Sequence, residues 1–366
     1  MVVQASRFLI IIAIIFSTSI SYSQNNQLEE KIDSFLNELS GADFSGTILV
    51  AKNDSILQRR AYGLASKELN VKNEIDTKFN IASITKTFTA VAILQLYEDG
   101  KIDLNTPIGK YLKDYPNEKI RESATISHLL THIAGLPNFY VTNFLDRCKF
   151  DFKEVKDFLP LFENESLLAE PGEEYNYDAA GYVLLGLIIE KVAGANYYDY
   201  LKEHIFEKAG MPNTAAYNVD AIIENKANGY TFAGDTTKPL KNNISFLSKA
   251  SPGGFHYSTV EDLFNFNKAL FNNKLISQKT LELMIEPRVK GYNTHLGYGI
   301  DVDQRYDEII LGHSGGWYGI SGEIIYLPES DYTITILSNV DSSMDSGKAM
   351  VSDFFKELLA GKIEDK

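Results

Sequence analysis

The chain has 366 residues, of which 44% are hydrophobic and 23% are charged. This is the usage of a globular protein, so a disordered chain, a collagen and a coiled coil are excluded. The formal net charge is -14 and no run of lysine and arginine is present, which argues against a nucleic-acid-binding surface, because phosphate contacts need clustered cations. The single cysteine, Cys148, excludes an internal disulfide framework and a cysteine-based zinc module.

The first 23 residues predict a cleavable secretory signal. Arg7 is their only charge, and the apolar run from Phe8 to Phe16 is followed by small polar residues. That run is shorter than the roughly 20 residues that a membrane span needs. We therefore expect cleavage near Ser23 and a secreted or periplasmic mature chain, from residue 24 on, with no stable membrane span.

The first third of the mature chain predicts a helix, a hairpin and a second helix. Apolar residues share one face over 28–39, and strand patterns over 46–51 and 56–62 flank a polar turn. A largely apolar helix is expected from Ser83 to Asp99, with Gly100 as its C-terminal stop.

The remaining sequence changes character twice. From about 101 to 246 it has helical patterns joined by proline-containing loops, and the most apolar helix is expected over 181–193. The last third predicts strands over 298–302, 308–312, 321–327 and 332–338 and a closing helix over 350–359. We infer an α/β (α+β) fold: an antiparallel β-sheet built from both chain ends and flanked by helices. A mostly helical part of about 101–246 is inserted between 24–100 and 247–366.

Residues 312–316 match G-x-S-x-G, the serine turn of α/β-hydrolases. That turn must lead into a helix, whereas 319–327 has the pattern of a strand. The base of such a triad must also follow the serine, and His313 is the last histidine of the chain. The hydrolase turn is therefore rejected.

His128 and His132 are spaced to lie on one helix face and could bind a metal. The intervening residues supply no glutamate base, and no acidic ligand is obvious nearby. We favour a helix end leading into a turn, and we expect no metal and no cofactor.

The segment Ser83-Ile84-Thr85-Lys86 predicts nucleophilic chemistry. Its spacing puts Ser83 and Lys86 on one helix face, one turn apart. A serine hydroxyl needs a base beside it, and a lysine can serve if burial lowers its pKa from about 10.4. The neighbouring residues are largely apolar, so Lys86 lies at the start of a buried helix, where a lysine is unusual unless it has a functional role.

In this setting the chain resembles the serine β-lactamase and penicillin-binding-protein superfamily, in the branch of class C β-lactamases, D-alanyl-D-alanine carboxypeptidases and related esterases. Further stretches resemble that family in the same order, over roughly residues 28–359. They are the end of the nucleophile helix at 94–104, L-L-T-H-x-x-G-L at 129–136, the tyrosine region at 177–186, a glycine-rich stretch at 251–254, and His313-Ser314-Gly315-Gly316 in place of K-T-G.

The resemblance implies a role for each matching position. Ser83 would be the acylated nucleophile, and Lys86 and Tyr177 would share the work of general base and acid, with the location of the proton left open. The backbone N–H groups of Ser83 and Gly316 would form the oxyanion hole. The substrate-binding residues would be His313, Ser314 and Gly315: His313 would line the cleft as a weaker cation than lysine, and Gly315 would let the substrate backbone approach the strand.

One departure from the family bears on the substrate. The usual Y-x-N motif is here Tyr177-Asp178-Ala179, and Ala179 offers no side-chain hydrogen bond. Asp178 is expected to be a solvated loop residue, with a compensating contact to Lys86 as the other possibility. Esterase or D-alanyl-D-alanine carboxypeptidase-type activity is thus favoured over efficient β-lactamase activity.

The sequence therefore predicts a secreted serine hydrolase that cleaves an ester, amide or peptide through a Ser83 acyl-enzyme. Its expected partner is a small-molecule or peptide substrate, with no nucleic acid and no required protein partner. The alternative is a catalytically weak or inactive protein that binds penicillin or cell-wall peptides.

Overall fold

The structure is a computed structural model that describes residues 27–41, 43–233, 235, 237, 239–341 and 347–360. The predicted signal at 1–23 lies outside the described residues. The chain divides into two compact units, one that ends at Asp43 and one that begins at Phe44. The first unit contains a helix over residues 27–38, as the apolar spacing predicted.

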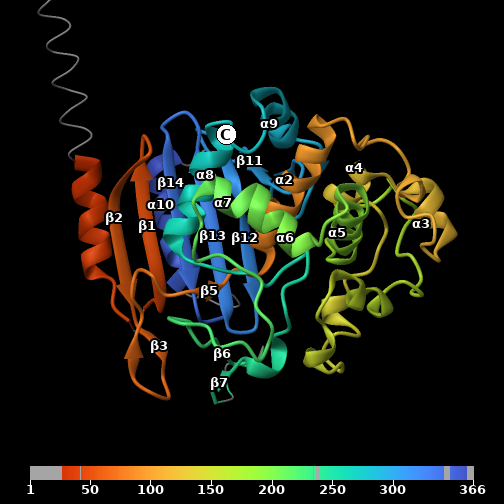
Figure 1. Cartoon of the computed structure of the whole chain (residues 1–366). Coiled ribbons are helices and arrows are strands. Elements are labelled where there is room, and N and C mark those ends of the chain that lie inside the picture. Colours follow the sequence, from red (N-terminus) through yellow and green to blue (C-terminus); the bar gives the residue numbers. More distant parts are fainter. Residues whose placement is uncertain are drawn as a thin grey trace, which may run out of the picture. The chain divides into compact units, whose positions relative to one another are not determined.

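One eight-stranded antiparallel sheet forms the centre of the second unit (Figure 1). Its strand order is β2-β1-β14-β13-β12-β11-β10-β9. The strands are β1 (Gly46–Lys52), β2 (Ser55–Tyr62), β9 (Val289–Lys290), β10 (His295–Leu296), β11 (Asp301–Asp303), β12 (Ile310–Trp317), β13 (Ile320–Leu327) and β14 (Tyr332–Ser338). Pairing of β1 with β14, Gly46 opposite Ser338, confirms a single sheet built from both ends of the chain.

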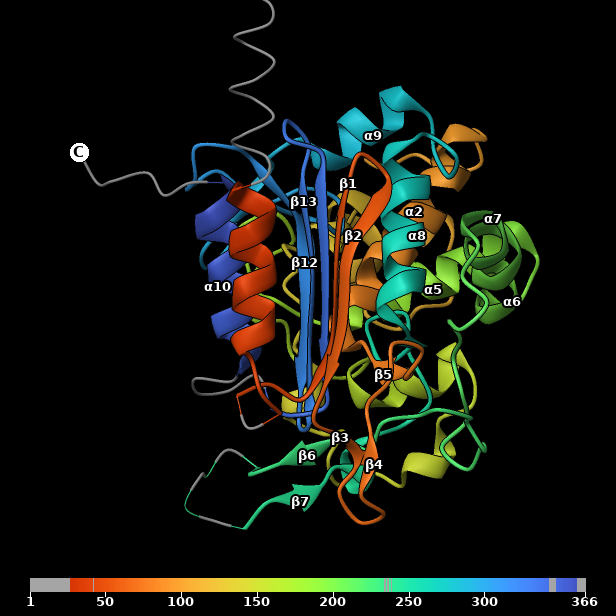
Figure 2. The ribbon, with the colours of Figure 1, turned by 90° about the vertical axis from the view of Figure 1, so that its left-hand side faces the viewer.

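Helices cover both faces of this sheet. Seen edge-on, α10 (Gly347–Ala360) lies against one face, and α2 (Thr85–Glu98) and α8 (Val260–Phe271) lie on the other (Figure 2). Every residue of β14 is buried, because this central strand is covered on both sides.

The nucleophile helix is preceded by a short turn of 3-10 helix, η1 (Ala82–Ile84), and α2 follows it directly. Eleven of the 14 residues of α2 are buried, so this helix runs through the interior of the protein. Gly100, with φ +68, lies just beyond its last turn and provides the left-handed stop that the sequence predicted.

Between residue 101 and residue 229 the described secondary structure is helical. It comprises α3 (Glu118–Ser123), α4 (Ile126–Leu130), α5 (Ala180–Ala193), α6 (Tyr197–Leu201), α7 (Glu207–Ala209), the 3-10 turns η2 (Ile108–Lys110), η3 (Phe139–Val141), η4 (Lys149–Asp151) and η5 (Val155–Leu161), and the π-helical turn η6 (Lys202–Phe206). The helix expected over 181–193 is α5, which ends at Gly194 with φ +67.

Short strand pairs, one 3-10 turn and one helix complete the secondary structure of the described residues. The pairs are β3 (Leu64–Ser66) with β4 (Val71–Lys72), β5 (Phe79–Asn80) with β8 (Tyr257–Ser258), and β6 (Tyr230–Thr231) with β7 (Lys241–Asn242); η7 (Ile244–Phe246) and α9 (Gln278–Ile285) lie between them and the last strands. None of the described helices is long and apolar enough to cross a membrane.

Two predicted strands are shifted. The strand expected over 298–302 begins at Asp301, because residues 297–300 form a tight turn in which the Gly297 N–H donates to the Ile300 carbonyl (2.9 Å). The strand expected over 308–312 begins at Ile310 and continues to Trp317. The G-x-S-x-G segment thus lies inside β12, and strand β13 follows it, which confirms the rejection of the hydrolase turn.

Candidate active site

Ser83 lies on η1, at the entrance to α2, on a backbone held in an unusual conformation. Ala82, just before it, has φ +41, in the left-handed region that residues with a side chain rarely adopt. The Asn80 side chain accepts from the Ala82 N–H (3.0 Å), and the Phe255 N–H donates to the Ala82 carbonyl (3.2 Å). Such strain persists only where the surroundings enforce it, and it clusters at functional sites.

Lys86 is brought next to Ser83, as the spacing predicted. Its Nζ donates to Ser83 Oγ (3.1 Å) and to the Gly253 carbonyl (2.6 Å), and the residue is only 1% exposed. Burial lowers the pKa of Lys86 to about 7, because water no longer stabilises the ammonium, and the negative charge of Asp178 opposes this shift. A substantial fraction of Lys86 is therefore neutral near neutral pH.

Tyr177 completes this group from the loop before α5. The centre of its ring lies 4.8 Å from Lys86 Nζ. Burial raises the pKa of the phenol well above its usual value, and a hydrogen bond with Ser83 opposes the shift. At neutral pH the phenol therefore carries its proton.

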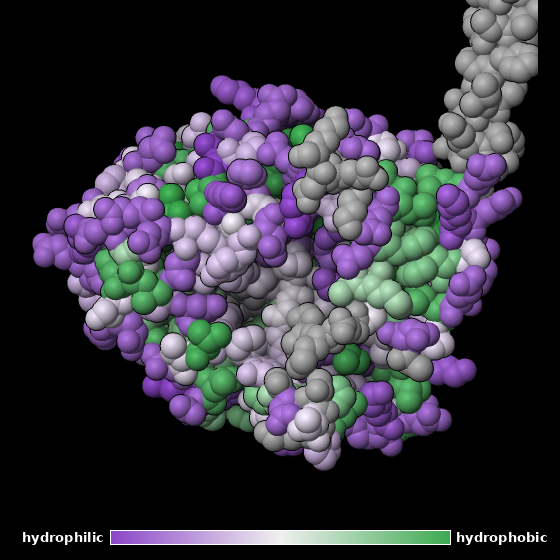
Figure 3. All heavy atoms as spheres, turned by 180° about the vertical axis from the view of Figure 1, so that it is seen from behind, coloured by the Kyte–Doolittle hydropathy of each residue, from purple (hydrophilic) through white to green (hydrophobic). Residues whose placement is uncertain are grey.

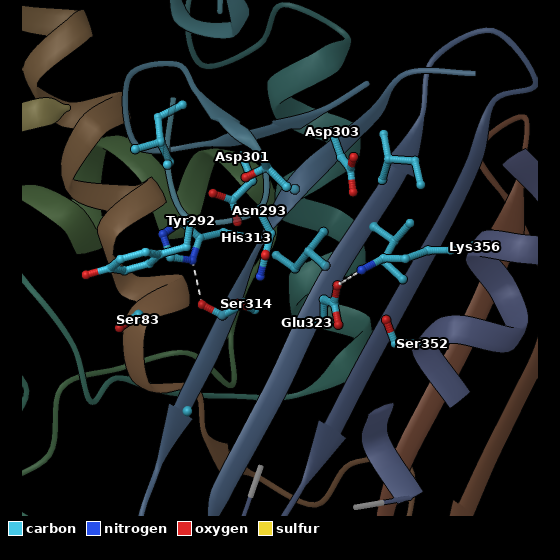
Figure 4. A pocket seen from close by; sticks show the side chains of 18 of the residues that line it. Ser83, Tyr292, Asn293, Asp301, Asp303, His313, Ser314, Glu323, Ser352 and Lys356 are labelled. Atoms are coloured by element: carbon cyan, nitrogen blue, oxygen red, sulfur yellow. Dashed lines mark hydrogen bonds and ion pairs between the residues drawn. The ribbon is translucent and has the colours of Figure 1, made fainter. Parts of the chain in front are cut away.

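His313 lies on β12 and contributes to the same cleft (Figure 4). Burial, and to a smaller extent the charge of Lys86, lower its pKa to about 3, so the imidazole is neutral at pH 7. Its Nδ1 lies 2.6 Å from the Ser314 carbonyl, which can only accept. Nδ1 therefore holds the proton and Nε2 is an acceptor, so His313 is not the weak cation that was expected.

Gly315 is required for a reason that differs from the expected one. A Cβ at this position would lie 2.2 Å from the Ile81 carbonyl oxygen and 3.2 Å from the Ser83 nitrogen. The backbone that approaches the strand here is thus the protein's own η1 segment. The absence of a side chain lets β12 lie against the turn that holds Ser83.

Gly316 and Ser314 lie on an open strand edge. β11 pairs with β12 only at residues 310–312, so residues 313–317 have no partner on that side among the described residues. Both are exposed, and both line the cleft together with Ser83, Tyr177 and His313. The molecule is visibly hollowed near the middle of the face that is turned away in Figure 1 (Figure 3).

The expectation that Asp178 is a solvated loop residue was wrong. Asp178 is 1% exposed, and its carboxylate accepts from the Gly181 N–H (2.5 Å) and lies 3.3 Å from His132 Nδ1. The His132 ring in turn packs on the ring of Tyr177, with 4.4 Å between centroids. Asp178 is thus part of the buried support of the site, and its charge is felt by Lys86.

Replacing Asp178 with alanine is expected to lower the free energy of unfolding by roughly 1.5–3 kcal/mol, the range for hydrogen bonds to charged groups. The Gly181 N–H would lose its acceptor, and His132 would lose the carboxylate beside Nδ1 while keeping the backbone N–H of residue 178. Urea denaturation measures the change. Asp220, which is exposed, is the matched control, and its alanine variant should stay within about 0.5 kcal/mol of the wild type. Equal losses in the two variants would contradict the role of Asp178.

The histidine pair considered for metal binding has separate structural partners. The Thr125 N–H donates to His128 Nδ1 (3.4 Å) at the start of α4, and His132 faces Asp178. The part of the chain that the structure describes contains no group of three or more side chains able to hold a metal ion.

Two residues of the site were missed by sequence reasoning. Asn80 fixes the strained Ala82 and also donates to the Phe255 carbonyl (3.1 Å), and Asp301 lines the cleft from β11. Asn80 stands three residues before Ser83, inside the segment that carries the motif, and that proximity was a usable signal. Asp301 is part of an unremarkable D-V-D sequence and gave none.

Comparison with known proteins agrees with this geometry. The profile of the family described as Beta-lactamase matches residues 32–351. Penicillin-binding protein 4* of Bacillus subtilis (strain 168) is 31% identical over 325 residues, which are 84% of this chain and 71% of that protein. The putative penicillin-binding protein PbpX of the same strain is 31% identical over 75% of this chain and 65% of its own length.

Two solved structures are similar over most of their length. A penicillin-binding protein from Bacillus halodurans has 30% identity and a TM-score of 0.77, and the match covers 85% of this chain and 97% of that one. The D-amino acid amidase of Ochrobactrum anthropi SV3, complexed with L-phenylalanine amide, has 26% identity and a TM-score of 0.77, over 92% and 98%.

The chain belongs to the beta-lactamase family. Its similarity to penicillin-binding proteins and to an amidase supports membership of a serine hydrolase superfamily with the beta-lactamase fold.

Proposed function

We propose that this protein is a secreted serine hydrolase that cleaves an amide, ester or peptide through an acyl-enzyme on Ser83. The observation that supports this most strongly is the contact of Lys86 Nζ with Ser83 Oγ inside a buried site where the pKa of Lys86 is about 7. A base with a pKa near the working pH is the efficient choice for proton transfer.

Neutral Lys86 takes the proton of the Ser83 hydroxyl as Oγ forms a bond to the substrate carbonyl carbon. The N–H groups of Ser83 and Gly316 stabilise the resulting oxyanion. The Tyr177 phenol retains its proton at neutral pH and is placed to donate one to the leaving group as its bond to carbon breaks. Water then attacks the acyl-enzyme, loses a proton to the same pair, and returns the Ser83 hydroxyl.

We favour open-chain amides and esters over β-lactams as substrates. Ala179 lacks the side-chain amide of the asparagine in the family's usual Y-x-N motif. The similar D-amino acid amidase supports amide cleavage within the same fold.

Rates on three substrates test the proposal: a chromogenic cephalosporin, a short-chain nitrophenyl ester and a D-alanyl-D-alanine peptide, each with the wild type and with Ser83→Ala. We expect turnover of the ester or peptide to exceed turnover of the cephalosporin and to vanish in Ser83→Ala. Turnover that survives the substitution would overturn the assignment of Ser83.

The second candidate is a protein that binds penicillin or cell-wall peptides without turnover, and the loss of the motif asparagine at Ala179 favours it. Stoichiometric labelling by fluorescent penicillin, with no turnover of any of the three substrates, would support this alternative.

The acid limb of kcat/KM is expected to rise with pH and to level off, with a midpoint near 7. Below that pH Lys86 is protonated and cannot accept the serine proton, and above it the neutral form predominates. Initial rates on the ester between pH 5 and 9 measure the profile. A flat profile across pH 7 would contradict Lys86 as the base.

Asp178→Asn is expected to move this midpoint to lower pH, because the Asp178 charge stabilises the Lys86 ammonium. Asp303→Asn removes a different carboxylate of the cleft, one held by Arg305, and should leave the midpoint in place. The same midpoint in all three proteins would show that Asp178 does not act on Lys86.

Secretion rests on residues 1–23 alone, and N-terminal sequencing of the protein from an expressing bacterium tests it. A mature chain that begins near residue 24 supports the proposal, whereas an intact Met1 in all of the product overturns it.

A further inference from the structure

Asp301 lies at the start of β11, opposite Gly312 of β12, and so next to His313 in the sheet. It lines the same cleft as Ser83 and Tyr177. Figure 4 shows Asp301 and His313 on neighbouring strands at the same end of that cleft. The charge of Asp301 also helps to raise the pKa of the Tyr177 phenol, so the carboxylate is electrostatically close to the reacting groups.

Asp301 differs from the other acidic side chains that the sheet contributes to the cleft. Asp303 pairs with Arg305 (2.6 Å), and Glu323 pairs with Lys348 (2.8 Å) and Lys356 (2.5 Å; Figure 4). Asp301 has neither an ion pair nor a hydrogen bond to its carboxylate within the described ranges. Both lysines at this end pair with Glu323 rather than with Asp301.

Asp301 is half-buried at the cleft, and its surroundings disfavour an uncompensated negative charge. Burial, together with the charge of Glu323, raises the pKa of Asp301 to about 7, and Lys356 opposes this only in part. A cation that entered the cleft would compensate the charge and stabilise the ionised form.

Other groups of the cleft favour the same kind of ligand. His313 lines the cleft and, with its proton on Nδ1, is neutral. Tyr175 and Tyr292 stand edge to face at the cleft, with 5.1 Å between ring centroids, and Tyr292 is 77% exposed. Ammonium groups are attracted to the faces of aromatic rings, to carboxylates and to acceptor nitrogens.

We propose that Asp301 binds a positively charged amine of the substrate, so that the enzyme selects amine-bearing acyl groups, such as amides of amino acids with a free amine, over carboxylate-bearing ones. This inference rests on the proposed function, because it takes the cleft at Ser83 as the substrate site. Asp301 is then a specificity-determining residue and takes no part in the bond-breaking steps.

Binding to a catalytically inert protein tests Asp301 without turnover. The probes are D-phenylalanine amide and 3-phenylpropionamide, which lacks the amine, titrated calorimetrically into Ser83→Ala at neutral pH, where an α-amine is still protonated. We expect the amine-bearing probe to bind about 10-fold tighter or more, as for a charge-assisted hydrogen bond. Adding Asp301→Asn should remove this preference, and adding Asp303→Asn, which removes the carboxylate that pairs with Arg305, should keep it.

An equal preference with and without the Asp301 carboxylate would overturn the inference, as would the absence of any preference in Ser83→Ala. Thermal melting checks that each variant is folded, and Asp301→Ser serves as a second variant if Asp301→Asn is not.

Turnover separates this inference from the proposed function. The ratio of kcat/KM for D-phenylalanine nitroanilide to that for 3-phenylpropionyl nitroanilide should fall about 10-fold in Asp301→Asn. No turnover of any substrate by the wild type would overturn the proposed function, and the binding experiment would still decide on Asp301. Turnover with an unchanged ratio would overturn the role of Asp301 alone.

Discussion

Replacing Lys86 with methionine is expected to lower kcat/KM by about 10²–10⁴, the range for the loss of a positioned general base. Methionine keeps an unbranched side chain of similar length at this buried position, so packing is largely retained while the Nζ contact with Ser83 Oγ is lost. Steady-state rates on the ester that the wild type cleaves measure the effect, with thermal melting as a check on folding.

Lys149 offers the matched control, because it is also buried but donates only to backbone carbonyls within 144–147. Lys149→Met should cost stability without a comparable loss of kcat/KM in the folded protein. A Lys86→Met protein that retained a tenth or more of the wild-type rate would contradict Lys86 as the base.

The substitution Gly315→Ala is expected to disable the site through the backbone. The new Cβ would lie 2.2 Å from the Ile81 carbonyl, so η1 must move away from β12. A displacement of about 1 Å at a reacting group can cost about 10² in rate, and overpacking of this kind costs about 1–3 kcal/mol of stability. Measurements of kcat/KM and of urea denaturation on one preparation separate the two effects.

Gly46→Ala is the matched control, since its Cβ would lie 1.9 Å from the Leu337 carbonyl of the neighbouring strand β14, which β13 separates from β12. We expect a comparable loss of stability with little loss of kcat/KM per folded molecule. Wild-type kcat/KM in Gly315→Ala would show that Ser83 does not depend on this close approach.

Much of the fold could be predicted because its signals are local. The β1–β2 hairpin, α5 with its Gly194 stop, and strands β13 and β14 follow from periodicity and turn residues within each segment. The predicted start of β11 was wrong because the turn before it depends on a distant part of the chain. Gly299 in this turn has φ +68, and the Thr87 hydroxyl of α2 donates to the Gly299 carbonyl.

The candidate site divides in the same way. Ser83, Lys86, Tyr177 and the His313 strand could be predicted, because they lie in motifs whose order along the chain is informative. The surroundings of Asp178 could not, since its burial depends on His132, which is 46 positions away. The low pKa of His313, and the lack of a partner for Asp301 among the residues that the structure describes, arise from packing that only the folded chain shows.

The central claim is that Ser83 becomes acylated, and covalent labelling tests it most directly. The protein is treated with a fluorophosphonate probe and with fluorescent penicillin, digested, and the modified residue is located by mass spectrometry. We predict one adduct per chain, on the peptide that contains Ser83, formed more slowly in Lys86→Met and absent in Ser83→Ala. An adduct on any other residue, or equal labelling of Ser83→Ala and the wild type, would contradict the account.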